Sequence, residues 1–162
     1  MSHYEAQRTL PYPREALFDL AADVERYPEF LPGWTAARIR RREGDLYHTD
    51  QVIAFGPFRA QFGSETRLER PERIAVRSND RMFRTFRLDW RFEPQPDGTC
   101  RVTVSVDIAL RSRLAQELFG RTVRRMADTI LSAFETRAHR LCGPARRASR
   151  NARSAAISNS QS

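Results

Sequence analysis

The sequence contains no lysine: all 28 of its basic residues are arginine, against 20 acidic residues. Schiff-base chemistry, which requires a lysine amine, is therefore excluded. Half of the net charge of +8 comes from Arg146, Arg147, Arg150 and Arg153, in a C-terminal segment with no acidic residue. Residues 1–142 are only mildly basic, and this balance does not indicate a DNA-binding protein.

Groups that commonly carry catalysis are also scarce. The two cysteines, Cys100 and Cys142, and the three histidines, His3, His48 and His139, lack metal-ligand spacing. No phosphate-binding loop, dinucleotide-binding glycine motif or Gly-x-Ser-x-Gly motif occurs. We therefore predict no metal site, no covalently attached cofactor and no enzymatic activity.

Long apolar runs are absent as well. None approaches the roughly 18 residues that a membrane span requires, and the N-terminus has no apolar segment like that of a secretory signal. We expect a cytoplasmic protein, and the surface of the inner membrane is a second location that we consider.

The middle of the sequence alternates apolar and polar residues, which is typical of antiparallel strands with one buried face. The alternation is clearest in "FRLDWRF" (86–92) and "CRVTVSVDIAL" (100–110), joined by the turn sequence "PDGT". Weaker patterns predict strands near 3–10, 35–43, 46–55, 58–70 and 73–79.

Residues 113–141 have helical spacing instead, with apolar side chains from Leu118 to Leu141 on one broad stripe. Ser112 is the expected N-cap, and Gly143-Pro144 is expected to end the helix. We predict one folded domain over residues 1–142. Residues 143–162, rich in Arg and Ser, are predicted to be a disordered tail.

Two short helices are expected after the first strand, one over residues 13–24 and one that Pro28 opens and Pro32 closes. The connection "RYPEFLPGW" (26–34) carries more apolar surface than a turn needs. We interpret it as the rim or floor of a cavity.

The predicted architecture provides such a cavity. One helix about 10 Å wide cannot cover seven strands spaced about 4.8 Å apart. The sheet must therefore curl around the helix, which leaves space on its concave face.

Two stretches of the sequence resemble one known group. "DVERYPEFLPGW" is similar to the signature of the coenzyme Q-binding START-like proteins, and residues 83–141 resemble the hairpin and last helix of that family. Where the family usually has Trp-Cys after the second proline, this chain has Gly33-Trp34-Thr35. The resemblance implies an α+β helix-grip fold (START/Bet v 1-like) of the polyketide cyclase/dehydrase superfamily, with about seven antiparallel strands curled around one long C-terminal helix.

The resemblance also implies a ligand. One mitochondrial member binds ubiquinone, whereas bacterial relatives are labelled ribosome-association toxins. Our first hypothesis is therefore a carrier or chaperone for ubiquinone or another hydrophobic small molecule, which supports respiratory electron transport. The alternative is a regulator that contacts the ribosome through its basic surface, and an aromatase/cyclase-type enzyme ranks third.

Twelve residues are the predicted cavity walls, with core packing as the alternative role for each. They are Tyr27, Phe30, Leu31 and Trp34 in the connection, Phe55, Phe62, Phe83, Phe86 and Trp90 in the strands, and Met126, Ile130 and Phe134 in the last helix. Tyr27 could donate a hydrogen bond to a quinone carbonyl or could fasten the short helix. The C-terminal arginines and Arg40–Arg42 are the predicted contacts with an anionic membrane.

Overall fold

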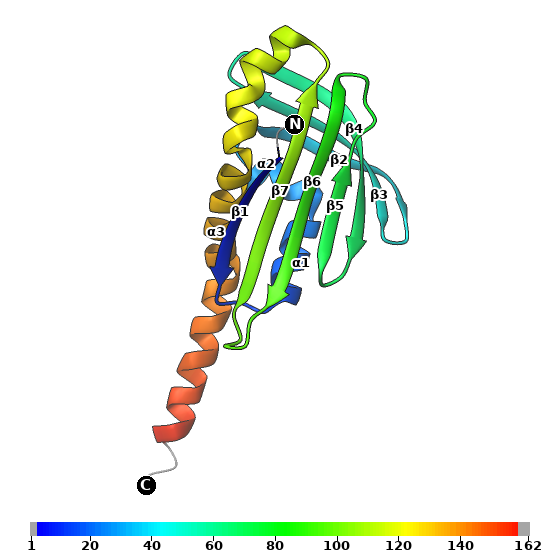
Figure 1. Cartoon of the computed structure of the whole chain (residues 1–162). Helices are drawn as coiled ribbons and strands as arrows, with labels where there is room; N and C mark the ends of the chain where they lie inside the picture. The colour runs from blue at the N-terminus through cyan, green and yellow to red at the C-terminus, as the bar shows by residue number, and fades with distance from the viewer. Residues whose placement is uncertain (1–2, 159–162) are drawn as a thin grey trace.

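The computed structural model describes residues 3–158 as one antiparallel sheet with one long helix and three short helical segments (Figure 1). The strands are β1 (His3–Leu10), β2 (Trp34–Glu43), β3 (Leu46–Phe55), β4 (Phe58–Glu69), β5 (Arg73–Arg77), β6 (Phe83–Pro94) and β7 (Cys100–Leu110). The helices are α1 (Arg14–Ala22), the 3-10 helix η1 (Val24–Arg26), α2 (Tyr27–Phe30) and α3 (Arg113–Ser158). The predicted order of elements and the helix-grip fold are confirmed.

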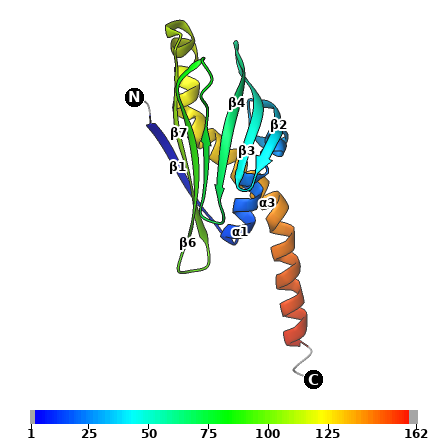
Figure 2. The same ribbon diagram turned by 90° about the vertical axis from the view of Figure 1, so that its right-hand side faces the viewer.

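The sheet has the strand order β1-β7-β6-β5-β4-β3-β2, so the first strand pairs with the last. Its curl places α3 on the concave side, with β1, β7 and β6 on one flank and β4, β3 and β2 on the other (Figure 2). Helix α3 packs mainly on β1 and β7, and α1 packs on β5 and β6. The short helices therefore close one end of the space that the curl encloses.

The turns follow the local sequence. The tight β3–β4 turn consists of Gly56 and Pro57, since Phe55 pairs with Phe58, and Gly56 has φ of 57°. Glycine adopts this left-handed conformation without the steric penalty of a side chain. The predicted "PDGT" turn between β6 and β7 likewise has Gly98 at φ 86°.

The alternation in β6 and β7 predicts the buried face correctly. Leu88, Trp90 and Phe92 from β6 are buried, as are Val102 and Val104 from β7. The Trp90 ring contacts Phe134 of α3 with centroids 4.9 Å apart. These contacts attach the long helix to the centre of the sheet.

The start of α3 is as predicted, but the predicted stripe is too broad. Ser112 Oγ accepts a hydrogen bond from the Ala115 backbone N–H at 3.2 Å, which confirms the N-cap. Leu118 and Leu141 are 60% and 49% exposed, so their assignment to the buried stripe is wrong. Successive helical residues are turned by about 100°, and the helix points Phe119 inward instead of Leu118.

The predicted end of the helix at Gly143-Pro144 is also wrong. Helix α3 continues to Ser158, so residues 143–158, which we expected to be disordered, have helical backbone and run past the sheet (Figures 1 and 2). A terminating glycine must adopt positive φ, and Gly143 does not. It is instead buried, and a β-carbon there would lie 3.5 Å from the Tyr12 hydroxyl. The domain boundary at residue 142 stays a prediction.

No helix within residues 3–158 is long and apolar enough to cross a membrane.

We predict that residues after Pro144 do not stabilise the domain. A chain that ends at Pro144 should melt within a few degrees of the full chain, because the segment after it is rich in Arg, Ser and Asn and has no periodic apolar residues that could join the core. A chain that ends at Ala138 is the control. It loses His139, whose Nδ1 lies 2.6 Å from Tyr12 Oη, and should melt lower. Calorimetry distinguishes the two, and a large loss in the first chain would contradict the boundary.

We predict that Gly33→Ala destabilises the protein more than Gly98→Ala. Both glycines have positive φ, 88° and 86°, and alanine costs about 1–2 kcal/mol in such a conformation. At Gly33 an added β-carbon would also lie 2.2 Å from the Phe55 ring, whereas at Gly98 it would meet nothing within 4 Å. Overpacking adds about 1–3 kcal/mol. Equal free energies of unfolding, measured by urea denaturation, would show that Phe55 moves aside freely.

Candidate functional site

Four polar side chains are buried on the concave face of β3 and β4, where apolar residues would be expected. Thr49 and Gln51 of β3 and Ser64 and Thr66 of β4 are between 0% and 6% exposed. Thr49 pairs directly with Ser64 across the two strands. We name these four residues the polar strip. Tyr47 and Ile53 border it on β3, so it lies within an apolar surface.

A chain of hydrogen bonds links the strip to the connection before β2. Trp34 Nε1 donates to Gln51 Oε1 at 2.8 Å, and Gln51 Nε2 donates to Ser64 Oγ at 2.6 Å. The indole can only donate, so it fixes the orientation of the Gln51 amide. The Ser64 hydroxyl accepts from Gln51 and still has its own proton to donate.

The polar strip contains hydroxyl groups whose capacity to donate a hydrogen bond is not used. Thr49 Oγ1 and Thr66 Oγ1 are buried and have no hydrogen-bond partner among the described residues. A buried hydroxyl without a partner costs about 1–3 kcal/mol. Three hydroxyl protons therefore face the interior unused, and the group that would satisfy them is a hydrogen-bond acceptor such as a carbonyl oxygen.

Aromatic rings surround the strip. Phe62, Phe83 and Phe86 form one cluster, with ring centroids 4.9–5.1 Å apart. Trp34 contacts the Phe55 ring edge-on at 6.2 Å. The structure thus brings five of the predicted wall residues together near the polar strip.

The other predicted wall residues are buried among the core of the domain. Leu31, Met126, Ile130 and Phe134 are at most 3% exposed, whereas Phe30 is half-buried. The Phe30 ring contacts Tyr27, and the Arg137 guanidinium carbon lies over it, 5.3 Å from the ring centroid. The assignment of all twelve residues to a ligand site stays a prediction.

Tyr27 fastens the short helices to one another. Its hydroxyl donates to the Ala21 carbonyl of α1, which favours the structural alternative for this side chain. Burial raises the pKa of Tyr27, and the nearby Asp23 charge raises it further. The nearby Trp90 indole lowers the pKa of Tyr27 by a smaller amount. Trp90 Nε1 itself has no hydrogen-bond partner among the described residues. Tyr27 is thus neutral, and its one proton is already used.

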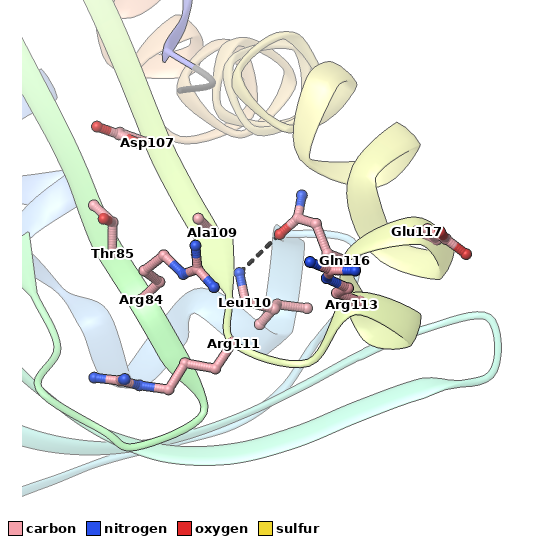
Figure 3. Close-up of a pocket in the computed structure, with 9 residues that line it drawn as sticks. All are labelled: Arg84, Thr85, Asp107, Ala109, Leu110, Arg111, Arg113, Gln116 and Glu117. Atoms are coloured by element: carbon pink, nitrogen blue, oxygen red, sulfur yellow. Dashed lines mark hydrogen bonds between the residues drawn. The ribbon is translucent and has the colours of Figure 1, made fainter.

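A surface hollow lies apart from the strip, between β6, β7 and the start of α3 (Figure 3). Its volume is about 670 Å³, and it is lined by Arg84, Thr85, Asp107, Ala109, Leu110, Arg111, Arg113, Gln116 and Glu117. Gln116 Oε1 accepts from the Leu110 backbone N–H at 2.8 Å, which joins β7 to the first turn of α3. None of the twelve predicted wall residues lines this hollow.

Few titratable groups lie in the interior. The buried polar side chains of the described residues are threonine, serine and glutamine, with no carboxylate, histidine or arginine among them. Burial raises the pKa of the Cys100 thiol to about 11, so it is not a nucleophile at neutral pH. Within residues 3–158 no group of three His, Cys, Asp or Glu side chains could hold a metal ion.

Sequence reasoning missed the polar strip and Phe119. The inward positions of β3 and β4 mix polar and apolar residues, so their alternation does not show which face is buried. The available signal was that Thr49 and Gln51 share a face with Tyr47 and Ile53. Phe119, which stacks on Phe58 at 4.3 Å, was hidden because its neighbour Leu118 fits the helical stripe equally well.

Comparison with known proteins places this geometry in context. The chain is 29% identical over 142 residues to the ribosome association toxin RatA of Pseudomonas aeruginosa, covering 88% of this chain and 99% of that protein. It is 26% identical to the mitochondrial coenzyme Q-binding protein COQ10 homolog B of Xenopus laevis, over 86% of this chain and 59% of that protein. The ZhuI aromatase/cyclase of Streptomyces sp. R1128 has the same fold, with a TM-score of 0.76, 18% identity, and coverage of 86% and 94%.

The family model for polyketide cyclase / dehydrase and lipid transport matches residues 10–135, which include both the apolar connection and the polar strip. The chain therefore belongs to the polyketide cyclase / dehydrase and lipid transport family.

Proposed function

We propose that the protein binds a polyisoprenoid quinone, ubiquinone in the first place, between the concave face of the sheet and α3, and carries it in support of respiratory electron transport. The observation that carries this proposal is the polar strip: unused hydroxyl donors on an otherwise apolar face. A quinone head presents two carbonyl acceptors, and its tail requires only apolar surface.

The energetics favour a carrier with a simple interior. Each CH₂ group moved from water to an apolar environment gains about 0.8 kcal/mol, so the isoprenoid tail supplies affinity. The hydroxyls of Thr49, Ser64 and Thr66 would then orient the head. The similarity to a coenzyme Q-binding protein supports this ligand. We place the protein in the cytoplasm and, during exchange of its ligand, at the inner membrane surface.

The role that we propose is not enzymatic. General acid–base catalysis needs a side chain that exchanges a proton near neutral pH. The polar groups around the strip are hydroxyls and one amide, which suit binding and orientation of a ligand but not proton transfer.

The second candidate is a regulator that associates with the ribosome. It is favoured by the similarity to the toxin RatA over nearly the whole of that protein. This role would use the exterior of the fold, whereas quinone binding uses the interior. The two functions can therefore be separated by substitutions.

We predict that Thr49→Val weakens quinone binding without destabilising the free protein. Valine has the shape of threonine but removes a hydroxyl that has no partner, so the free energy of unfolding should stay equal or rise by about 1 kcal/mol. Binding of a short-tail ubiquinone should weaken about fivefold, which corresponds to about 1 kcal/mol. Quenching of tryptophan emission measures this, because the buried Trp34 donates a hydrogen bond to Gln51 of the strip.

Thr103→Val is the matched control for that experiment. Thr103 is 7% exposed but lies on β7 between Val102 and Val104, which face the core, so its side chain is on the opposite face of the sheet. Its substitution should leave quinone affinity unchanged. Equal effects of the two substitutions, or no saturable quenching by the unaltered protein, would remove the polar strip from the ligand site.

We predict that Ile130→Phe separates the two candidate functions. Ile130 is 1% exposed on the inner side of α3, so a larger ring there should narrow the interior at a cost of about 1–3 kcal/mol. Thr136→Trp, on the exposed side of α3, is the control. The Ile130→Phe protein should fold, bind less quinone, and fail to restore respiration in a strain that lacks the protein.

Two outcomes would contradict the carrier role. One is that the folded Ile130→Phe protein loses quinone but still restores respiration. The other is that the unaltered protein shifts the association of ribosomal subunits in sucrose gradients and Ile130→Phe has the same activity. The second outcome would establish the ribosomal function in place of transport.

A further inference from the structure

Three chain connections meet at the end of the fold where α3 begins: the β3–β4 turn, the loop between β5 and β6, and the β7–α3 junction (Figure 1). The Arg111 backbone N–H donates to the Met82 carbonyl at 3.0 Å, and the Phe58 ring stacks on Phe119. The β6–β7 hairpin lies at the opposite end. We call this region the α3-start end.

Exposed leucines are concentrated at the α3-start end. Leu114 is 67% exposed and Leu118 is 60% exposed, and they are one helical turn apart on the same side of α3. The only other large hydrophobic residue exposed to this extent in the described chain is Leu141, about six turns further along the helix. Two leucines on consecutive turns form a small apolar ridge.

Unpaired arginines surround this ridge. Six exposed arginines at the α3-start end have side chains that form no ion pair or hydrogen bond among the described residues; they are Arg59, Arg81, Arg84, Arg111, Arg113 and Arg121. Other guanidinium groups are paired: Arg70 with Asp19 at 2.9 Å, for example, and Arg8 with Asp128 at 2.6 Å. Seven further exposed arginines of the described residues are also unpaired, on β2, β4, β6 and later turns of α3; they are Arg38, Arg67, Arg87, Arg91, Arg124, Arg125 and Arg140. The α3-start end is thus a surface that combines six unpaired arginines with two exposed leucines.

Asp107 and Glu117 line the hollow beside Arg84 and Arg111, but no carboxylate of the described residues forms an ion pair with the six arginines. Asp80 accepts a hydrogen bond from the Met82 backbone N–H at 3.1 Å. Glu117 lies on α3, directed away from Arg84 and Arg111 (Figure 3). Three of the six arginines line the hollow of about 670 Å³ described above, which has room for a phosphate group.

We propose that the α3-start end docks on an anionic lipid bilayer, with Leu114 and Leu118 inserted among the acyl chains and the surrounding arginines bound to lipid phosphates. Leucines flanked by arginines are the combination that an interface between headgroups and acyl chains stabilises. RNA would bind the arginines through its phosphates, but it offers no apolar layer for two exposed leucines. The membrane is therefore the partner that uses both features.

A series of contacting side chains connects the docking surface to the polar strip, and this part of the inference rests on the proposed quinone binding. Behind Leu118, the Phe119 ring contacts Phe58 at 4.3 Å and Phe55 at 5.7 Å. Phe55 contacts Trp34, which donates to Gln51 of the strip. We call the Phe119, Phe58 and Phe55 rings the aromatic plug. Docking would place them next to the acyl chains, where a quinone tail resides.

The predicted membrane contact at Arg40–Arg42 differs from the α3-start end, because its arginines have partners within the protein. Arg40 and Arg41 pair with Asp50 and Glu43 at 3.0 and 3.1 Å, and Arg42 lies over the Tyr47 ring. These arginines are already satisfied within the protein. The side chains of Arg146, Arg147, Arg150 and Arg153 lie outside the described part of the structure.

The test is co-sedimentation of the full chain with vesicles of phosphatidylcholine, with and without phosphatidylglycerol. The unaltered protein should bind only the anionic vesicles, and less at high salt. The double variants Leu114→Ser/Leu118→Ser and Arg111→Ser/Arg113→Ser should each weaken binding about tenfold or more. Leu141→Ser and Arg38→Ser/Arg67→Ser, which remove an exposed leucine and two unpaired exposed arginines elsewhere, are the matched controls and should not.

Several results would overturn the docking surface. One is an equal loss of vesicle binding in the control variants, and another is equal binding of the unaltered protein to neutral vesicles. A third is that only the arginine variants lose vesicle binding and the same arginines are needed to bind ribosomal subunits. The third result would identify an RNA surface. Titration of short-tail ubiquinone without vesicles tests the proposed function separately. If the leucine variants keep quinone binding but lose vesicles, both proposals stand, whereas vesicle binding without quinone binding would refute only the ligand.

Discussion

The contact of one helix with a sheet wider than itself governs this structure. Helix α3 packs on β1 and β7, which the pairing of the first and last strands brings side by side. Strands β2, β3 and β4 lie beyond the width that the helix covers, so they must curl over it and receive other side chains on their concave face. The polar strip and the Phe55 and Phe62 rings lie on these strands, and the apolar connection leads into β2. The candidate site therefore lies between α3 and the strands that curl over it.

The polar strip has the features of a preorganised binding site that lowers the stability of the free protein. Thr49 and Thr66 could each be valine in a sheet of this shape, and the free protein would be more stable without their unpaired hydroxyls. A ligand with an acceptor would recover this cost on binding, and any ligand that binds only the folded state stabilises it by mass action. The strip thus connects stability to the presence of ligand, and a rise in melting temperature on addition of quinone follows from the same hydrogen bonds that would orient it.

The parts of the fold that depend on local pattern could be predicted from the sequence. Strands β6 and β7 alternate without interruption, and the turns at Gly56 and Gly98 use glycine where the backbone needs it. What depends on tertiary contact could not. Gly143 resembles a helix stop until its burial near Tyr12 is known. Thr49 and Gln51 resemble the solvent side of a strand until the curl of the sheet is known, and Leu118 cannot be told from Phe119 by spacing alone.

The two candidate functions make opposite demands on the same molecule. Transport of a quinone requires the interior donors, the aromatic plug and an apolar ridge that meets the bilayer, and these lie in order from Ser64 to Gln51, Trp34, Phe55, Phe119 and Leu118. Association with a ribosome requires only the arginines, and it assigns no role to exposed leucines or to unpaired hydroxyls in the core. The unpaired hydroxyls in the interior and the exposed leucines on the surface both destabilise the free protein. Both are explained if one ligand passes between a membrane and the polar strip. For that reason we place quinone transport before ribosome association.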